Sequence, residues 1–456
     1  MKALSIILNK VFVACRKFGR KFPFDMLLAA LFCCLGLFFY VIQRGKKISK
    51  DTTKDNIVVI GWRFYNKGSQ AMALTIIDRL KRKYPNKNVY FFRFDVSNEN
   101  EKSLYNFPIL HFSLGSRLRL LLPALRPFRS NGKHNYIDKK ISDILKEASA
   151  IIDISGFILS SQWSLGYQIK YILNIMIARK YAVPFHIFPQ SLGPFEYPRR
   201  YKVFLYTLLQ LYLQYPVRVF SREKEGYDAV CKIRSSGLDV SYDIVIQNDG
   251  YDLANIYKDK IVFKAFDIEN GTVGLVPNLR MMQQTDPEPV FSLYKSVIEQ
   301  LIKSRKTIYI FRHSREDLEV CEEIRKSFLH HQAVRLITDD LNCIELENLI
   351  KQFDFLIASR YHAVVHSYKN NVPCLTIGWA DKYRELMEKF SQEDYLFDCR
   401  GCILDNDIRI ALARMIRNHT YESSKIAEDI GRIQGKESQF YSEGHSSVAR
   451  EQLLAL

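Results

Sequence analysis

The amino-acid sequence predicts two α/β domains in a row, preceded by a basic and apolar N-terminal segment. The chain has 456 residues, which is too long for one ordinary hydrophobic core. Short apolar, β-branched runs alternate with helix-length stretches, a pattern typical of a parallel sheet with helices on both faces. The alternation stops once and restarts, which divides the chain into two such units.

The first unit follows a short polar linker and is expected to form a domain over residues 51–250. Its expected strands lie at residues 57–60, 89–94, 150–154, 185–188 and 217–220. Its expected helices lie at residues 71–84, 167–181, 200–214 and 224–233. Residues 235–260 show no helical period and are expected to connect the two domains.

The second unit is expected to form a domain over residues 251–400, followed by a helical tail at residues 401–456. Its expected strands lie at residues 272–276, 307–311, 334–337, 355–358 and 374–377. Its expected helices lie at residues 287–303, 315–327 and 361–369.

Residues 1–50 are expected to tether the protein to a membrane. Residues 26–42 form an uncharged apolar run of 17 residues, the short limit for a membrane-spanning helix. A basic cluster follows the run and no small-x-small cleavage site precedes that cluster, which favours a retained anchor over a signal peptide. Positive charge flanks both ends, so its orientation and an in-plane placement stay open. We expect this segment to be separable from the folded core.

The charge distribution argues against nucleic acid as a partner. Residues 1–50 hold ten lysine or arginine residues and one acidic residue, and so carry +9 of the net charge of +17. No nucleic-acid-binding motif accompanies the remaining charge, so an anionic membrane surface and small anions are the expected partners.

The nine cysteines are scattered and form no disulfide pattern. Cys399 and Cys402 form a CxxC pair, but no second ligand pair is suitably placed, so no metal is expected. A reducing compartment fits best, which places the domains on the cytoplasmic face of a bacterial membrane. Two glycosylation sequons, at Asn270 and Asn418, keep a type II protein in a secretory lumen as the alternative.

Ligands of parallel α/β sheets bind beyond the carboxyl ends of the strands, so polar residues just after each strand are the site candidates. In the first domain these residues are Asn66, Gly68, Asp153, Ser155, Gln190 and Arg222. In the second domain they are Arg360, Tyr361, His362, Trp379 and Lys382. An arginine two residues before a histidine joins an anion grip to a group that titrates near neutrality. For each segment alone, an ordinary strand-to-helix turn remains the competing interpretation.

Taken together, these segments resemble the polysaccharide pyruvyltransferase family. The resemblance covers roughly residues 56–395 and rests on seven motifs in the same order. They are NKG at 66–68, DISG at 153–156, PQSLGPF at 189–195, SREK at 221–224, PN at 277–278, SRYHA at 359–363 and GWADKY at 378–383.

The resemblance implies a glycosyltransferase-B-like pair of Rossmann-type domains facing across a cleft, with phosphoenolpyruvate as the donor and no cofactor. It implies that Arg222, Arg360 and His362 bind the donor, with the main chain near Tyr361 contributing. The remaining strand-end residues, Asn66, Gly68, Asp153, Ser155, Gln190, Trp379 and Lys382, are expected to face a glycan acceptor, lipid-linked in the simplest case. Gln70 departs from the family pattern, because many relatives carry an acidic residue there.

The chemistry fits these residue types. Phosphoenolpyruvate carries a carboxylate and a phosphate, and two arginines, one from each domain, can hold such an anion bidentately. His362 is the expected acid or phosphate partner, with a pKa raised by the phosphate. The alternatives are a nucleotide-sugar glycosyltransferase on the same fold and a non-catalytic component of glycan assembly. The acceptor sugar and the oligomeric state are not predicted.

Overall fold

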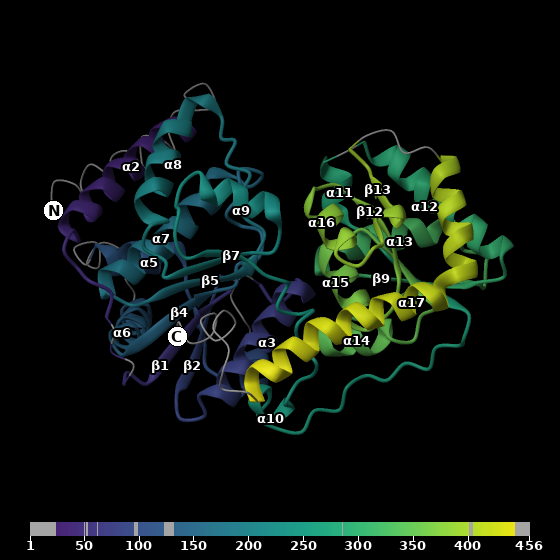
Figure 1. Ribbon diagram of the computed structural model, residues 1–456, viewed down its shortest axis with the longest axis horizontal. Coiled ribbons are helices and arrows are strands. Elements are labelled where there is room, and N and C mark those ends of the chain that lie inside the picture. The colour runs from purple at the N-terminus through teal and green to yellow at the C-terminus, as the bar shows by residue number, and fades with distance from the viewer. Residues whose placement is uncertain are drawn as a thin grey trace.

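The computed structural model describes residues 24–49, 51, 53–61, 63–94, 99–122, 132–284, 286–400 and 405–442. The described chain forms two α/β domains, one built on a seven-stranded sheet and one on a six-stranded sheet (Figure 1). All strand pairs in both sheets are parallel. The predicted fold class, two Rossmann-like domains, is confirmed.

The first sheet has the strand order β3-β2-β1-β4-β5-β6-β7. Its strands are β1 (Asn56–Ile60), β2 (Asn88–Arg93), β3 (Ile109–His111), β4 (Ala148–Asp153), β5 (Phe185–Gln190), β6 (Arg218–Ser221) and β7 (Leu238–Val240). Every residue of β1 is buried, and its side chains alternate between two hydrophobic clusters, one on each face of the sheet. The two short strands β3 and β7 have too few residues to give a periodic signal.

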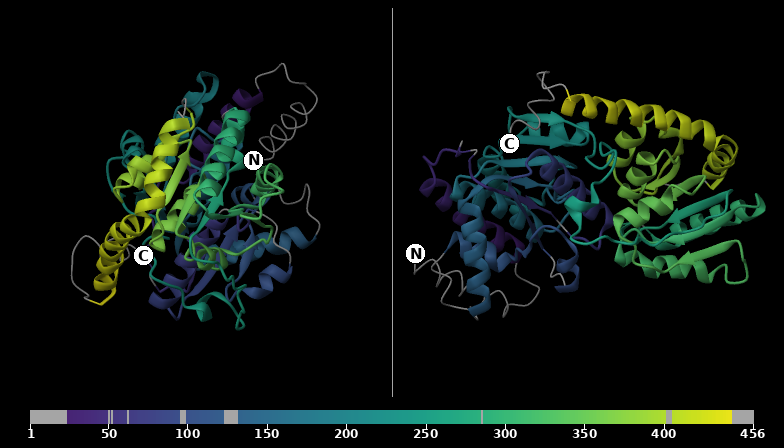
Figure 2. Two further views of the ribbon diagram at one scale, coloured as in Figure 1. Left: turned by 90° about the vertical axis from the view of Figure 1, so that its right-hand side faces the viewer. Right: turned by 90° about the horizontal axis from the view of Figure 1, so that it is seen from below.

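The helices of the first domain cover both faces of this sheet (Figure 2). They are α2 (Phe24–Ile42), α3 (Lys67–Lys83), α4 (Glu99–Leu104), α5 (Leu114–Leu121), α6 (Gly132–Lys146), α7 (Leu165–Tyr181), α8 (Arg199–Tyr212), α9 (Lys224–Cys231) and α10 (Leu253–Ile256).

The second sheet repeats the same winding in the order β10-β9-β8-β11-β12-β13. Its strands are β8 (Thr272–Val276), β9 (Thr307–Phe311), β10 (Val334–Ile337), β11 (Phe355–Ala358), β12 (Cys374–Gly378) and β13 (Leu396–Asp398). Its helices are α11 (Leu279–Gln284), α12 (Pro287–Lys303), α13 (Leu318–Lys326), α14 (Cys343–Ile350), α15 (Tyr361–Lys369), α16 (Lys382–Glu388) and α17 (Asp405–Ser442). Short 3-10 turns lie at Arg315–Asp317 and Glu393–Tyr395.

The strand order reverses between β1 and β4 in the first sheet and between β8 and β11 in the second. At such a reversal the loops after neighbouring strands diverge and leave room for a ligand beyond their carboxyl ends. The topology therefore favours the loops after β1, β4, β8 and β11 as ligand-binding loops.

The connection between the domains differs from the expected residues 235–260. Strand β7 and helix α10 lie within that range and belong to the first domain, where Tyr257 pairs with Tyr105 and Asn255 Nδ2 donates to Asp78 at 2.8 Å. Residues 259–271 then lead to β8 without a helix or a strand. Helix α17 runs from the second domain back toward the first (Figure 1), where Gln434 Nε2 donates to the carbonyls of Ile246 and Asn248 at 3.1 Å.

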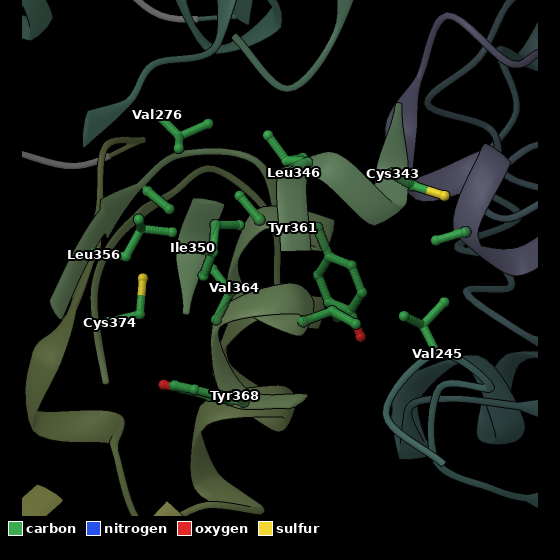
Figure 3. Close-up of a cluster of buried hydrophobic side chains, with 14 of the residues drawn as sticks. Val245, Val276, Cys343, Leu346, Ile350, Leu356, Tyr361, Val364, Tyr368 and Cys374 are labelled. Carbon is green, nitrogen blue, oxygen red and sulfur yellow. The ribbon is translucent and has the colours of Figure 1, made fainter. Parts of the chain in front are cut away.

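The two domains share one hydrophobic cluster. It joins β1 and α3 of the first domain to all of the central strands of the second, and Figure 3 shows the part that contains Val245 and Tyr361. Gln70 adds a polar bridge, because its Oε1 accepts from Cys343 N at 2.9 Å and its Nε2 donates to Tyr105 Oη at 3.0 Å. The neutral amide at this position therefore holds the start of α14 against α3.

The expectation of a separable N-terminal segment is wrong for the described part of it. Helix α2 packs along α8 (Figure 1), and Ala29, Phe32, Leu35 and Phe39 are buried in the first domain's core. Residues 1–23 lie outside the described residues. Among those described, α2 is the one helix long and apolar enough to cross a membrane, over Asp25–Ile42.

Candidate functional site

The candidate site lies where the end of β6 in the first domain meets the start of α15 in the second. Arg222 directly follows β6, and Arg360 is the N-cap residue of α15, which begins at Tyr361. Both arginines follow buried strands, β6 and β11, so the sheets fix the two backbones. The domain interface thereby brings Arg222, Tyr361 and His362 into direct contact.

Arg222 is buried and almost fully engaged. Its Nη2 donates to Ser191 Oγ at 2.7 Å, and its Nη1 binds the carboxylate of Asp243. Its guanidinium carbon lies 4.6 Å from the ring centroid of Tyr361, a cation–π contact across the interface. Its Nε makes no hydrogen bond but lies 3.6 Å from Oε1 of the buried Glu223, within ion-pair distance. Each nitrogen of this guanidinium therefore has an oxygen partner inside the protein.

His362 lies beside Arg222 and Asp243. Its Nε2 is 3.5 Å from Arg222 Nη1 and 3.4 Å from Asp243 Oδ2. Burial lowers the pKa of His362 to about 4, although the Asp243 carboxylate opposes this shift. Among the protein's own groups, desolvation outweighs the one neighbouring carboxylate. The expected rise depends on a donor phosphate beside the ring and stays a prediction. At neutral pH the imidazole is neutral.

Gly68 is needed for this arrangement. A Cβ added at Gly68 would lie 2.2 Å from His362 Cγ, closer than any real contact. The glycine therefore lets the first turn of α3 approach the imidazole ring. Sequence reasoning assigned Gly68 to the acceptor, whereas the structure places it against the histidine expected to bind the donor.

Asp243 and His313 are site residues that sequence reasoning missed. Arg222 and His362 hold the pKa of Asp243 well below its usual range, although burial alone would raise it. Asp243 comes shortly after β7, whose three residues are too few to reveal a strand end. His313 follows β9 and is fully buried near His362, and burial lowers its pKa well below 6.5. Its place after a predicted strand was the signal that could have found it.

Arg360 is neutralised by its own domain. Its Nε donates to Asp317 Oδ2 at 2.9 Å and its Nη2 donates to Glu316 Oε1 at 2.7 Å, with a further bond from Nη2 to Asp317. The fork formed by Nε and Nη2 is therefore occupied. Only Nη1 has no partner among the described residues. To bind a ligand bidentately as expected, Arg360 would have to use the other edge of its guanidinium, which carries Nη1.

Lys382 is the cation of the site without an ion pair. Its Nζ lies 4.2 Å from the ring centroid of Phe157, which follows β4, and 5.3 Å from that of Tyr361. The rings of Trp379 and Tyr383 complete an aromatic cage at 5.5 and 5.8 Å. No carboxylate of the described chain lies within ion-pair distance of this ammonium. Burial first, and then Arg222, lower the pKa of Lys382 to about 7.

Asp153, Ser155 and Gln190 form a separate buried network at the reversal point of the first sheet. Asp153 Oδ1 accepts from Ser155 N at 3.1 Å, and its Oδ2 accepts from Gln190 Nε2 at 3.2 Å. Gln190 Nε2 also lies 3.2 Å from Tyr171 Oη. Burial raises the pKa of Asp153. This network reaches the domain interface through Phe157, which contacts Lys382.

The other predicted site residues have structural contacts. Asn66 is the N-cap of α3, where its side chain accepts from Ser69 N at 3.2 Å, and it pairs with Ser314 across the interface. Trp379 lies in the aromatic cage. The described residues contain no group of three or more histidine, cysteine or acidic side chains arranged to hold a metal ion. Cys402 of the CxxC pair lies outside them.

Solved structures with the same architecture support the fold assignment. The UDP-GlcNAc 2-epimerase of Methanocaldococcus jannaschii matches with a TM-score of 0.50 and 11% identity, over 80% of this chain and 93% of that one. A putative UDP-N-acetylglucosamine 2-epimerase of Listeria monocytogenes matches with a TM-score of 0.51 and 11% identity, over 86% and 98%. At such identity the likeness shows the fold alone, which is glycosyltransferase-B-like.

Comparison by sequence is more specific. A search among curated proteins finds no match. The family model described as polysaccharide pyruvyl transferase, however, matches residues 66–381, which is more than two thirds of the 456-residue chain. This range begins at Asn66, ends at Asp381, and contains Arg222, Arg360 and His362. The chain belongs to the polysaccharide pyruvyl transferase family.

Proposed function

We propose that this protein transfers a pyruvyl group from phosphoenolpyruvate to two hydroxyls of one sugar in a cell-surface glycan or its lipid-linked precursor. The observation that carries the proposal is the cluster of Arg222, Arg360 and His362 at the domain interface, within the matched family range, together with Lys382 directly after it. Arg222, Lys382 and His362 around the ring of Tyr361, with Arg360 next to it in the chain, suit a small, highly charged anion.

The donor is proposed to bind among these cations. Arg222 and Arg360 arrive already paired with carboxylates, so they offer directed hydrogen bonds more than net charge. Lys382 has no ion pair among the described residues and supplies a further positive charge, whose charged form is supported from a longer distance by the Glu223 carboxylate. The Nη1 of Arg360, which has no partner among the described residues, is an available donor for the carboxylate or the phosphate.

The reaction balances with two hydroxyls of the acceptor. A proton adds to C3 of phosphoenolpyruvate, and the first sugar hydroxyl forms a bond to C2. The second hydroxyl then forms its bond to C2 as the bond from C2 to the phosphate oxygen breaks. One hydroxyl proton replaces the proton delivered to C3, and the other leaves with the phosphate.

His362 is proposed to deliver the proton. Its pKa of about 4 keeps it neutral before the donor binds. A phosphate beside the ring would raise the pKa toward neutrality, and Asp243 supports the charged form. The neutral ring can therefore gain a proton only when the donor is in place, which limits proton transfer to the loaded site.

The acceptor is proposed to bind on the first-domain side, near Asp153, Ser155 and Gln190, with Phe157 and Trp379 as apolar surfaces for the sugar ring. The domains are proposed to lie on the cytoplasmic face of a bacterial membrane, where lipid-linked precursors and phosphoenolpyruvate are both accessible. No cofactor or metal enters this scheme.

The proposal is tested by incubating the full-length protein with phosphoenolpyruvate and lipid-linked glycans, and measuring phosphate release and the mass of a pyruvate ketal on the glycan. His362→Asn should lower both signals about a hundredfold or more, and His331→Asn, on an exposed residue away from the interface, should leave them unchanged. Glycan extension with a nucleotide sugar but no ketal would show a glycosyltransferase instead. A folded protein without either turnover would indicate a non-catalytic assembly component.

A further inference from the structure

Helix α2 is fixed to the first domain at both ends. At its start, Asp25 forms an ion pair with Arg200 of α8 at 2.9 Å. Just after its end, Lys46 Nζ donates to the carbonyl of Lys180 at 2.6 Å, and Ser49 N donates to the carbonyl of Ala182 at 2.8 Å. A helix tied down at both ends lies along the domain.

The middle of α2 is docked as closely as its ends. Tyr212 Oη of α8 donates to the carbonyl of Gly36 at 2.6 Å. A Cβ at Gly36 would lie 2.2 Å from a methyl carbon of Leu208, so the glycine permits the close approach. Arg179 of α7 stacks on the ring of Tyr40, with its guanidinium carbon 4.1 Å from the centroid. Leaving this position for a spanning orientation would break all of these contacts.

The outward face of α2 is apolar and has no partner in the described chain. Leu37, Phe38 and Val41 are 41%, 38% and 66% exposed, and Cys34 is exposed on the same stripe. The spacing 34, 37, 38 and 41 is that of one helix face. On the neighbouring helix α8, Val203 is 71% exposed. A helix face that contacts only water normally carries polar residues at such positions.

Basic residues border this apolar stripe. Arg44, Lys46 and Lys47 follow α2 and are exposed. Arg199, Arg200 and Lys202 lie at the start of α8 and are also exposed. The sequence before α2 adds six further basic residues. An apolar stripe with a basic rim complements the headgroup region of an anionic bilayer, in which the apolar side chains enter the acyl boundary.

We propose that α2 does not cross the bilayer but lies in its plane, and that the outward stripe of α2 with the basic start of α8 is the surface that binds an anionic leaflet. The first domain, which carries Asp153 and Gln190, is then the domain held against the lipid. This assignment concerns only the membrane surface and holds whichever reaction the cleft performs.

The test measures the depth of nitroxide labels on full-length protein bound to vesicles of phosphatidylglycerol and phosphatidylcholine. Labels are placed one at a time at Cys34, Phe38→Cys and Val41→Cys, with the other accessible cysteines replaced by serine. An in-plane helix puts all three labels at one shallow depth. A spanning helix would separate the labels at 34 and 41 by about 10 Å along the bilayer normal, which would overturn the proposal. Labels that stay in water on bound protein would overturn it as well.

Charge variants test the same surface by vesicle co-sedimentation. Phe38→Glu should lower the affinity for mixed vesicles at least about tenfold, because a carboxylate enters the acyl boundary. The double variant with Arg44→Glu and Lys47→Glu should lower the affinity only for vesicles that contain phosphatidylglycerol. Val262→Glu is the matched control, since Val262 is 90% exposed on the connection between the domains. Equal loss in the control, or no loss at Phe38, would refute the surface.

Discussion

Lys382→Met should stabilise the protein while weakening donor binding. The lysine keeps an unfolded-state pKa near 10.5 and has a folded-state pKa of about 7. The folded state therefore disfavours the ammonium, and this cost is fully present below pH 7 and disappears as the pH rises toward 10.5. Methionine keeps the aliphatic length and removes the charge.

The size of the effect follows from the shift. At about 1.4 kcal/mol per pKa unit, the shift of the lysine corresponds to about 5 kcal/mol at most. The side chain is only partly buried, so solvent screening reduces the expected gain to about 1–2 kcal/mol. A domain of this size gains about 2–4 °C in melting midpoint per kcal/mol. The gain should be largest near pH 6 and should vanish near pH 10.

The Lys382→Met change should lower the affinity for the donor although it raises the stability. Loss of one charge-assisted contact costs about 1.5–3 kcal/mol, which is about tenfold to a hundredfold in the dissociation constant for phosphoenolpyruvate. Calorimetric titration with phosphoenolpyruvate, beside thermal melting at both pH values, measures the two effects. Lys83→Met is the matched control, because burial lowers the pKa of Lys83 to about 8 at the far end of α3. It should stabilise the protein and leave the donor affinity unchanged. A destabilised Lys382→Met protein with normal donor affinity would refute the reasoning.

Four further outcomes are expected. In the wild type, kcat/KM for the donor should fall as the pH rises through about 7, since Lys382 loses its charge there, and Lys382→Arg should move this fall to higher pH. Asp243→Asn keeps the shape but removes the carboxylate beside His362, so turnover should drop at least about a hundredfold, and the melting midpoint should also fall because the buried Arg222 loses its ion-pair partner. Arg222→Lys should raise KM for the donor although the net charge is unchanged, because an ammonium lacks the planar fork whose two separate nitrogens bind Ser191 and Asp243; an unaltered KM would remove Arg222 from the site. His362→Asn should lower turnover about a hundredfold or more with little loss of stability, and retained turnover would exclude its catalytic role.

The sequence was sufficient for the fold because most strands of a parallel sheet are buried on both faces. Continuous apolar runs such as residues 272–276 therefore marked β8 directly. The missed strands β3, β7 and β13 have three residues each and are edge or near-edge strands, which leaves no periodic signal. For the same reason, the predicted connection between the domains, residues 235–260, begins too early and includes β7.

For the site, strand ends located Arg222, Arg360 and His362, but they could not show what each side chain contacts. Asp317 and Glu316 bind Arg360, and both lie in the 3-10 turn that opens the helix expected at residues 315–327, but the helical pattern does not show that they face Arg360. Likewise, nothing in the spacing shows that Gly68 packs on His362 from another domain. Contacts between domains depend on how the two sheets are docked, which local sequence patterns do not record.

Helix α16 connects the two domains beside the proposed donor site. Lys382 at its start supplies the cation without an ion pair. One turn later, Glu385 accepts from Glu225 N at 2.9 Å, and so caps α9 of the first domain. Lys389 at its end donates to the carbonyl of Arg222 at 2.5 Å. Because Arg222 lies two residues before α9, one helix of the second domain holds the backbone that carries the first-domain arginine. Separation of the domains would therefore remove Lys382 from Arg222 and open the space between them, and an anion that bridges the two would favour the docked arrangement.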